Sequence, residues 1–167
     1  MSDVVVRLAA EEELAAVGEL SVAAFEADGY LDGGRSDPYA AVLADASARW
    51  READLLVAVD GDGVLLGTVT FAMAGSRYAQ LAEAGEAEFR VLAVGVGARG
   101  RGVGELLTRA VIGRARELGA SGVVLSSLPE QRRAHRIYER LGFRRVADRD
   151  WSPRGGVELL AFVLGLG

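Results

Sequence analysis

Residues 86–118 read EAEFRVLAVGVGARGRGVGELLTRAVIGRAREL, and the expected fold is built around them. The stretch from Phe89 to Val94 is short, apolar and rich in strand-forming residues, which predicts a buried strand. From Val103 to Leu118 apolar residues recur at helical spacing, which predicts an amphipathic helix. A glycine-rich turn, Arg99 to Gly104, joins the two.

A strand, a glycine-rich turn and a helix N-terminus in this order are typical of an anion-binding site. The first turn of a helix has N–H groups without partners inside the helix and carries a partial positive charge. Glycines lack the side chains that would keep a phosphate away from the backbone. A Walker loop is excluded because it needs a lysine, and every basic residue of this chain is arginine. The spacing of Gly100, Gly102 and Gly104 excludes a G-x-G-x-x-G dinucleotide fingerprint.

The remaining pattern, R-x-x-G-x-G at Arg99, Gly102 and Gly104, resembles the acyl-CoA pyrophosphate loop of the GNAT acetyltransferase superfamily. The match extends to the strand before the loop and to a later A-x-x-x-Y-x-x-x-G-F pattern. These further positions are Leu92, Ala93 and Val94, followed by Ala134, Tyr138, Gly142 and Phe143. A glycine turn alone is common, whereas these motifs together are specific, and the resemblance covers about residues 4 to 165 in the order of elements.

The resemblance implies an N-acetyltransferase that moves an acetyl group from acetyl-CoA, its co-substrate, to a primary amine by direct attack. It also implies that the pantetheine arm pairs with the strand before the loop and that the pyrophosphate meets the turn. Gln131 stands where relatives often have an asparagine that contacts the cofactor. The expected cofactor-binding residues are Leu92, Ala93, Val94, Arg99, Gly100, Arg101, Gly102, Val103, Gly104, Gln131 and Ala134.

Glu86 and Glu88 are the candidates for a general base. They lie two apart at the start of the central strand, a spacing that puts both side chains on one face. An amine arrives protonated, and a carboxylate can remove that proton directly or through water. The resemblance places the base at Glu86, with Glu88 as the second candidate; a polar strand end at the surface is the alternative interpretation of both.

Tyr138 is the candidate for a general acid. On the predicted helix it shares an apolar face with Ala134 and Leu141, a position that usually belongs to the core. The resemblance gives it a second role, because the family holds at this position the acid that protonates the leaving CoA thiolate. The catalytic set is therefore Tyr138, Glu86 and Glu88, and no metal ligand is expected.

The fold class predicted is α/β, with one GNAT-like domain over residues 1–167 and a mixed, mostly antiparallel central sheet flanked by helices. Turn signals such as Asp37-Pro38 and Asp60-Gly61-Asp62-Gly63 set the boundaries. The expected order is βααβββαβαββ. Strands are predicted at 4–8, 55–59, 64–71, 86–94, 123–125, 143–146 and 159–164, and helices at 11–25, 38–51, 103–118 and 131–141, with a short helix possible at 78–83.

Composition and charge restrict the partners. The chain has 167 residues and no cysteine, which excludes disulfides and thiolate nucleophiles and, with no signal sequence evident, favours a cytoplasmic protein. Residues 1–88 carry 5 Arg against 17 Asp and Glu, and residues 89–167 carry 14 Arg against 7, which gives net charges of −12 and +7. An acidic half favours a cationic acceptor, with an ordinary solvated surface as the alternative. No nucleic acid and no membrane partner is expected, and a homodimer is left open.

Two other classes of function fit the same turn. A non-catalytic acyl-CoA-binding or sensor module would keep the loop without the chemistry, and a nucleotide-binding protein would use the turn for a different phosphate. The acceptor itself, a small molecule or a peptide amine, is not specified by any motif.

Overall fold

The computed structural model describes residues 3–167, and these form two compact units. The first unit contains residues up to Phe71 together with Val91–Leu107, and the second contains Ala72–Arg90 together with Thr108–Gly167. The chain passes from one unit to the other within β3 (Leu65–Met73), β4 (Glu86–Val94) and α4 (Val103–Glu117).

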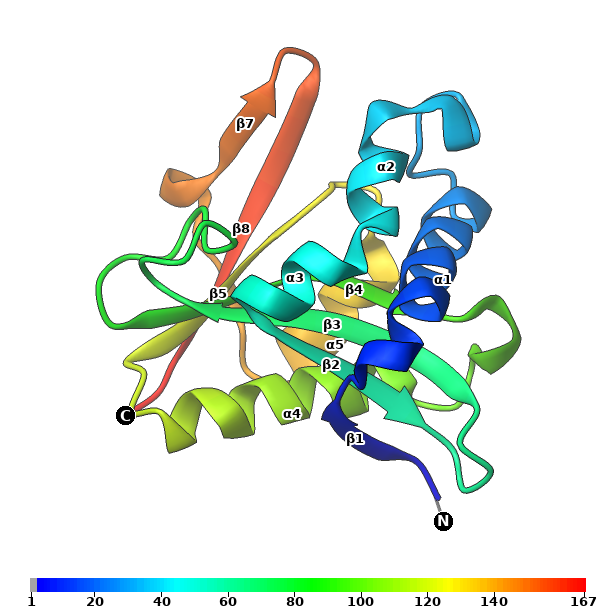
Figure 1. Cartoon of the computed structure of the whole chain (residues 1–167). Coiled ribbons are helices and arrows are strands. Elements are labelled where there is room, and N and C mark those ends of the chain that lie inside the picture. Colours follow the sequence, from blue (N-terminus) through cyan, green and yellow to red (C-terminus); the bar gives the residue numbers. More distant parts are fainter. Residues whose placement is uncertain (1–2) are drawn as a thin grey trace. The chain divides into compact units, whose positions relative to one another are not determined.

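In the first unit, helices follow an edge strand and lead into a hairpin (Figure 1). β2 pairs antiparallel with both β1 and β3, and β3 is the neighbour of β4. The Asp60–Gly63 turn joins β2 to β3 as predicted, and Oδ1 of Asp60 accepts from the N–H groups of Asp62 and Val64. The other elements of this unit are β1 (Val5–Leu8), η1 (Glu11–Glu13), α1 (Leu14–Ala27), η2 (Gly34–Ser36), α2 (Pro38–Ala44), α3 (Ala46–Glu52) and β2 (Asp54–Val59).

The core of this unit lies where α1, α2 and α3 contact one another and α3 contacts β2. Leu14 and Val17 of α1 pack with Val57 of β2, and all three are buried. Elsewhere in the unit, β3 comes very close to β4 and the start of α4. A Cβ on Gly67 would stand 2.9 Å from the carbonyl oxygen of Ala93, so only glycine fits at this crossing.

The second unit is built on the parallel pair β4 and β5 (Gly122–Ser127) and the antiparallel pair β5 and β8 (Val157–Gly165). Most of α4 and the whole of α5 (Arg132–Arg140) belong to it. Gly119 (φ 73°) ends α4 in the left-handed conformation expected of a helix C-cap. Its remaining elements are β6 (Arg144–Arg145), η4 (Ala147–Arg149) and β7 (Trp151–Arg154), with β6 and β7 both paired to β8.

The α/β class, the mixed sheet and the positions of the main elements agree with the sequence-based expectation, and the structure differs from it in three places. The helix predicted at 38–51 is two helices, because Asp45 interrupts the first and accepts from the N–H of Ala48 to cap the second. The loop before β8 contains β7, in which Nε1 of Trp151 donates to Ser126. No helix forms at 78–83, where two backbone N–H groups instead donate to Glu88.

None of the helices within residues 3–167 combines the length and the apolar composition needed to cross a bilayer.

Candidate active site

The two parallel strands at the centre of the second unit stay paired for only part of their length. β4 and β5 are in register from Glu86↔Gly122 to Glu88↔Val124, whereas β5 continues to Ser127 in its pairing with β8. Further along β4, Val91 adopts a φ of 53°, a left-handed conformation that costs a β-branched residue about 1–3 kcal/mol. Val91 is buried against Val22 and Leu31, so packing within the first unit holds it there. The strand is therefore irregular immediately before Leu92, Ala93 and Val94.

The glycine turn connects η3 (Val96–Ala98) to α4. Gly100 and Gly102 have φ values of 82° and 74°, and a Cβ on either would meet open space. The backbone conformation therefore requires these glycines, and the space beside them is open, as an incoming phosphate needs. The N–H of Leu106 donates to the carbonyl of Gly102, so the first turn of α4, from Val103 through Gly104, directs its N–H groups toward this turn.

Arg99 holds the turn in place. Its guanidinium donates to both carboxylate oxygens of Asp28, at 3.0 and 3.2 Å, and its Nε donates to the carbonyl of Val94 at 3.1 Å. These contacts tie the turn to the end of α1 and to the end of β4. Arg101 makes a distant ion pair with Asp3 at 3.8 Å, and its side chain is the more accessible of the two arginines.

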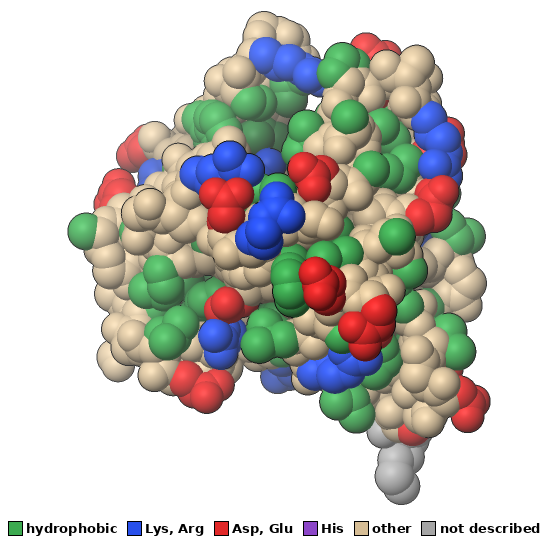
Figure 2. Space-filling model, in the orientation of Figure 1, with side chains coloured by type: hydrophobic (Ala, Val, Ile, Leu, Met, Phe, Trp, Pro, Cys, Tyr) green, Lys and Arg blue, Asp and Glu red, His purple; other side chains and the backbone are tan. Residues whose placement is uncertain are grey.

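The acidic residues of the 28–37 loop are partly committed to the fold. Asp28 is paired with Arg99, and Asp37 is buried and accepts from the N–H groups of Asp32 and Tyr39 to cap α2. Acidic and basic side chains both lie on the face that Figure 2 shows. The net charge of residues 1–88 therefore overstates the negative potential available to a ligand.

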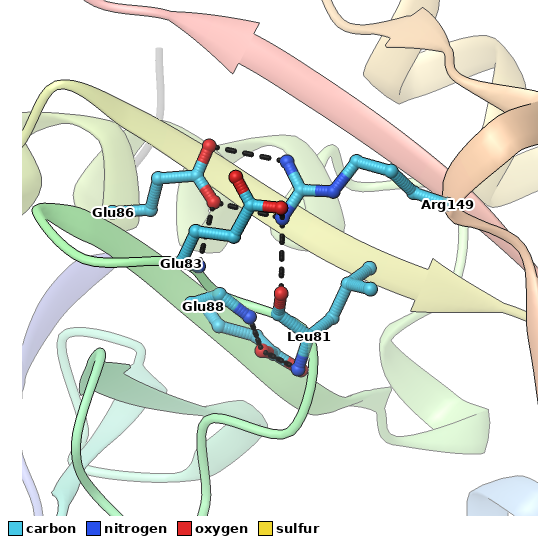
Figure 3. A network of polar contacts seen from close by, with 6 residues as sticks. Leu81, Glu83, Glu86, Glu88 and Arg149 are labelled. Carbon is cyan, nitrogen blue, oxygen red and sulfur yellow. Dashed lines mark hydrogen bonds and ion pairs between the residues drawn. The ribbon is translucent and has the colours of Figure 1, made fainter.

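Glu86, the first candidate for the base, is bound to an arginine. Its two carboxylate oxygens accept from Nη1 and Nη2 of Arg149 in η4, at 3.1 and 2.8 Å, and one also accepts from the N–H of Glu83 (Figure 3). These hydrogen bonds, with the Arg149 pair dominant, hold the pKa of Glu86 below its usual value. A carboxylate in this state is a weak base.

Glu88, the second candidate, has different surroundings. The residue is only 3% exposed, and its Oε1 accepts from the N–H groups of Leu81 and Ala82 at 2.7 and 2.8 Å. Burial raises the pKa of Glu88, and the backbone hydrogen bonds offset that effect only in part. Of the two carboxylates, Glu88 is therefore the one whose pKa is raised, and Glu86 the one whose pKa is lowered.

Tyr138 of α5 lies in an aromatic cluster of the second unit. It is 4% exposed, and its ring centre lies 5.8 Å from those of Phe89 and Phe143 and 5.9 Å from that of Phe162. The ring therefore belongs to the core, as its place on an apolar helix face predicted. Edge and tilted contacts to three neighbours fix its orientation.

Gln131 and Ala134 stand at the beginning of α5. Oε1 of Gln131 accepts from the hydroxyl of Ser127 at 2.7 Å and from the N–H of Leu128 at 2.8 Å, and Nε2 of His135 lies 3.0 Å from the same hydroxyl. Gln131 therefore fixes the connection from β5 to α5, and Ala134 is partly exposed beside it. Sequence reasoning did not find this polar cluster, because its members come from two separate elements.

Arg149 was also missed. It binds Glu86, which precedes it by 63 residues, and its Nη2 donates to the carbonyl of Leu81 at 2.9 Å. Nothing in the surrounding sequence, Ala-Asp-Arg-Asp, distinguishes this arginine from its many neighbours.

Comparisons with known proteins agree with this fold and these motifs. Mycothiol acetyltransferase of Beutenbergia cavernae is 37% identical over 103 residues, which are 62% of this chain and 30% of that protein, so the chain spans less than a third of that relative's length. The structure of yncA from Salmonella typhimurium, solved with acetyl-CoA, superposes with a TM-score of 0.71 at 23% identity and covers 99% of this chain and 95% of that one.

A GNAT-family acetyltransferase from Staphylococcus aureus Mu50 gives a TM-score of 0.76 at 14% identity, with coverage of 98% of this chain and 99% of its own. At these identities the solved structures establish the fold. The family model described as Acetyltransferase (GNAT) family matches residues 14–143, which contain the central strand, the glycine turn and the α5 motif. The resemblance to the GNAT superfamily inferred from the motifs is thereby confirmed, and the chain belongs to the GNAT acetyltransferase family.

Proposed function

We propose that this protein transfers the acetyl group of acetyl-CoA to a primary amine by direct attack of the amine on the thioester. The glycine turn carries this proposal: left-handed Gly100 and Gly102 open the backbone beside the N-terminus of a 15-residue helix. Backbone N–H groups and the helix dipole at such a place suit the pyrophosphate of CoA. The family membership supports the same co-substrate.

Within this scheme the turn residues Gly100 to Gly104 bind the pyrophosphate through the main chain, and Arg101 adds a nearby positive charge. The pantetheine arm pairs with main-chain groups of Leu92, Ala93 and Val94, and a backbone N–H near Val94 stabilises the developing oxyanion. Arg99 acts on the turn through Asp28 and Val94, so we assign it to holding the turn in place. Gln131 and Ala134 are the cofactor contacts proposed from α5.

We assign the general base to Glu88. A buried carboxylate with a raised pKa removes a proton from an ammonium group more readily than one that an arginine neutralises. Glu86 then has a supporting role. Tyr138 is the proposed acid that returns a proton to the CoA thiolate, and the aromatic contacts that fix its ring would also fix its hydroxyl.

The acceptor class that we propose is a cationic amine, on a small molecule or a peptide. This proposal is supported by the excess of acidic residues before position 89. Some of these residues are not available to a ligand, because they cap helices or pair with arginines. An attraction of this kind is screened by salt over about 8 Å at physiological ionic strength. The rate with matched cationic and carboxylate-bearing amines, at two salt concentrations, tests it. A preference for the anionic amine, or no effect of salt, contradicts it.

A panel of amines incubated with acetyl-CoA tests the proposed function as a whole. The chain has no cysteine, so a thiol reagent in the assay reports released CoA without background from the protein. We expect amine-dependent thiol release with at least one class of amine. Tight CoA binding without turnover on any amine would favour the acyl-CoA sensor, and displacement of CoA by ATP or NAD would favour the nucleotide-binding protein.

A further inference from the structure

The peptide group between Leu81 and Ala82 is held at both of its polar ends. Nη2 of Arg149 donates to the carbonyl oxygen of Leu81 at 2.9 Å, and the N–H of Ala82 donates to Oε1 of Glu88 at 2.8 Å (Figure 3). A peptide group is planar and conjugated, so a cation at its oxygen polarises the N–H at its other end. Arg149 and Glu88 therefore act on each other through a single peptide group.

Arg149 is itself held and partly neutralised by Glu86. The two side chains are 17% and 15% exposed, and Glu83, which is largely exposed, adds a weaker ion pair to Arg149 at 3.9 Å. The N–H of Glu83 also donates to Glu86, so the carboxylate binds both the arginine and the turn that the arginine contacts. All of these groups belong to the second unit.

We propose that Arg149 and Glu86 are positioning residues that hold the Leu81–Ala82 peptide against Glu88 and set the charge that this carboxylate meets. The proposal rests on Glu88 as the base. Neither residue contacts a substrate in this assignment; both act through the peptide between them and Glu88. Two carboxylates that the sequence offered as rival bases thus have different and linked roles.

The sign of the effect follows from the charges that face Glu88. These are Arg90 on its own strand and Arg149 in η4, and Arg149 in turn interacts with the carboxylates of Glu86 and Glu83. Loss of the arginine charge weakens donation from Ala82 and leaves Glu86 unpaired, and both changes favour the protonated form of Glu88. Loss of the Glu86 charge has the opposite result, because Arg149 then polarises the peptide more strongly.

The test measures the pKa of the Glu88 carboxyl directly, by ¹³C NMR titration with the signal assigned through Glu88→Gln. In Arg149→Gln we expect the pKa of Glu88 to rise by about half a unit, and in Glu86→Gln to fall by a similar amount. The double variant should lie near the wild-type value, and Arg149→Lys, which keeps the charge, should lie closer to wild type than Arg149→Gln. Arg154→Gln, a change at an exposed arginine of β7, is the matched control and should have no effect.

If Arg149 and Glu86 only braced the turn, both single variants would shift the pKa of Glu88 in the same direction. The pKa in the double variant would then be no closer to the wild-type value. That outcome, or a pKa that no variant moves, overturns the proposal. The pH profile of kcat/KM is recorded on the same proteins. Its acid limb tests whether Glu88 is the base, separately from the coupling between Arg149 and Glu88. If the NMR titration moves as expected while the limb of the rate profile stays in place, the coupling stands and Glu88 is not the base.

Discussion

The beginning of β4 contains two glutamates in opposite states. At Glu86 an arginine supplies two hydrogen bonds and a charge, and the pKa of the carboxyl is lowered. At Glu88, two residues further, burial dominates and the pKa is raised, although two backbone N–H groups reach the same oxygen. The two glutamates thus differ both in burial and in the charge of their hydrogen-bond donors, and both differences separate their pKa values in the same direction.

This comparison predicts that the two glutamates contribute very differently to the rate. Glu88→Gln keeps the size of the side chain and removes the base, so we expect kcat/KM to fall by about a hundredfold or more. Glu86→Gln should cost less than about tenfold, because its effect on the base is indirect. Steady-state kinetics with the best amine of the panel measures both, and a larger loss in Glu86→Gln would reverse the assignment of the base.

A substitution in the glycine turn should change the affinity for CoA without altering either glutamate. Gly102→Val forces a β-branched residue into a left-handed conformation and puts a side chain where the pyrophosphate should approach the backbone. We expect the Kd for CoA, measured by calorimetry, to rise by roughly tenfold or more. If the affinity for CoA is unchanged in Gly102→Val, the turn does not bind the pyrophosphate.

Gly97→Val is the matched control for this change. Gly97 lies in η3, a Cβ there meets open space, and its φ is not positive. Gly97→Val adds the same valine side chain to the connection between β4 and α4, but it causes no backbone strain there. We expect CoA affinity close to that of the wild type and a thermal midpoint above that of Gly102→Val.

Tyr138→Phe extends the comparison from the base to the acid. The ring keeps its contacts with Phe89, Phe143 and Phe162, so most of its packing energy is retained, and the proton donor is lost. We expect kcat to fall by roughly tenfold, with the alkaline limb of the pH profile affected and the acid limb in place. An unchanged kcat, with chemistry shown to limit the rate, would leave Tyr138 as a core residue only.

Local signals made much of the fold predictable. Asp37 caps α2 directly before Pro38, and Asp60 organises the β2–β3 turn, both through hydrogen bonds to residues within four positions. The capping of α3 by Asp45 is equally local, yet the run of helix-forming residues around it hid the break. The glycine turn before α4 is where the sequence predicts it, and Gly100 and Gly102 both have positive φ values there.

The states of the charged residues were not predictable, because they depend on partners far away in the chain. Asp28 is neutralised by Arg99, 71 residues later, and Glu86 by Arg149, 63 residues later. Counting charges in residues 1–88 could not reveal either pair. The sequence placed Glu86 and Glu88 on one face of a strand and the resemblance ranked Glu86 first, whereas the different partners of the two carboxylates are visible only in the folded chain.

The smallest predicted effect is on stability, where the two glutamates should again differ in sign. The folded-state pKa of Glu86 is lowered, so its contribution is present above the unfolded pKa, near 4.5, and is lost as the pH falls below it. Glu86→Gln should therefore destabilise the protein by about 1 kcal/mol at neutral pH and by less at pH 4.

The folded-state pKa of Glu88 is raised, so its protonated form is the stabilising one, and stability is lost as the pH rises from 4.5 through the folded-state pKa. Glu88→Gln, which mimics the protonated form, should gain stability relative to wild type as the pH rises. Urea unfolding at pH 4, 5.5 and 7 measures both differences, and if they change with pH in the same direction, the two carboxylates do not have the opposite pKa shifts on which the assignment of the base depends.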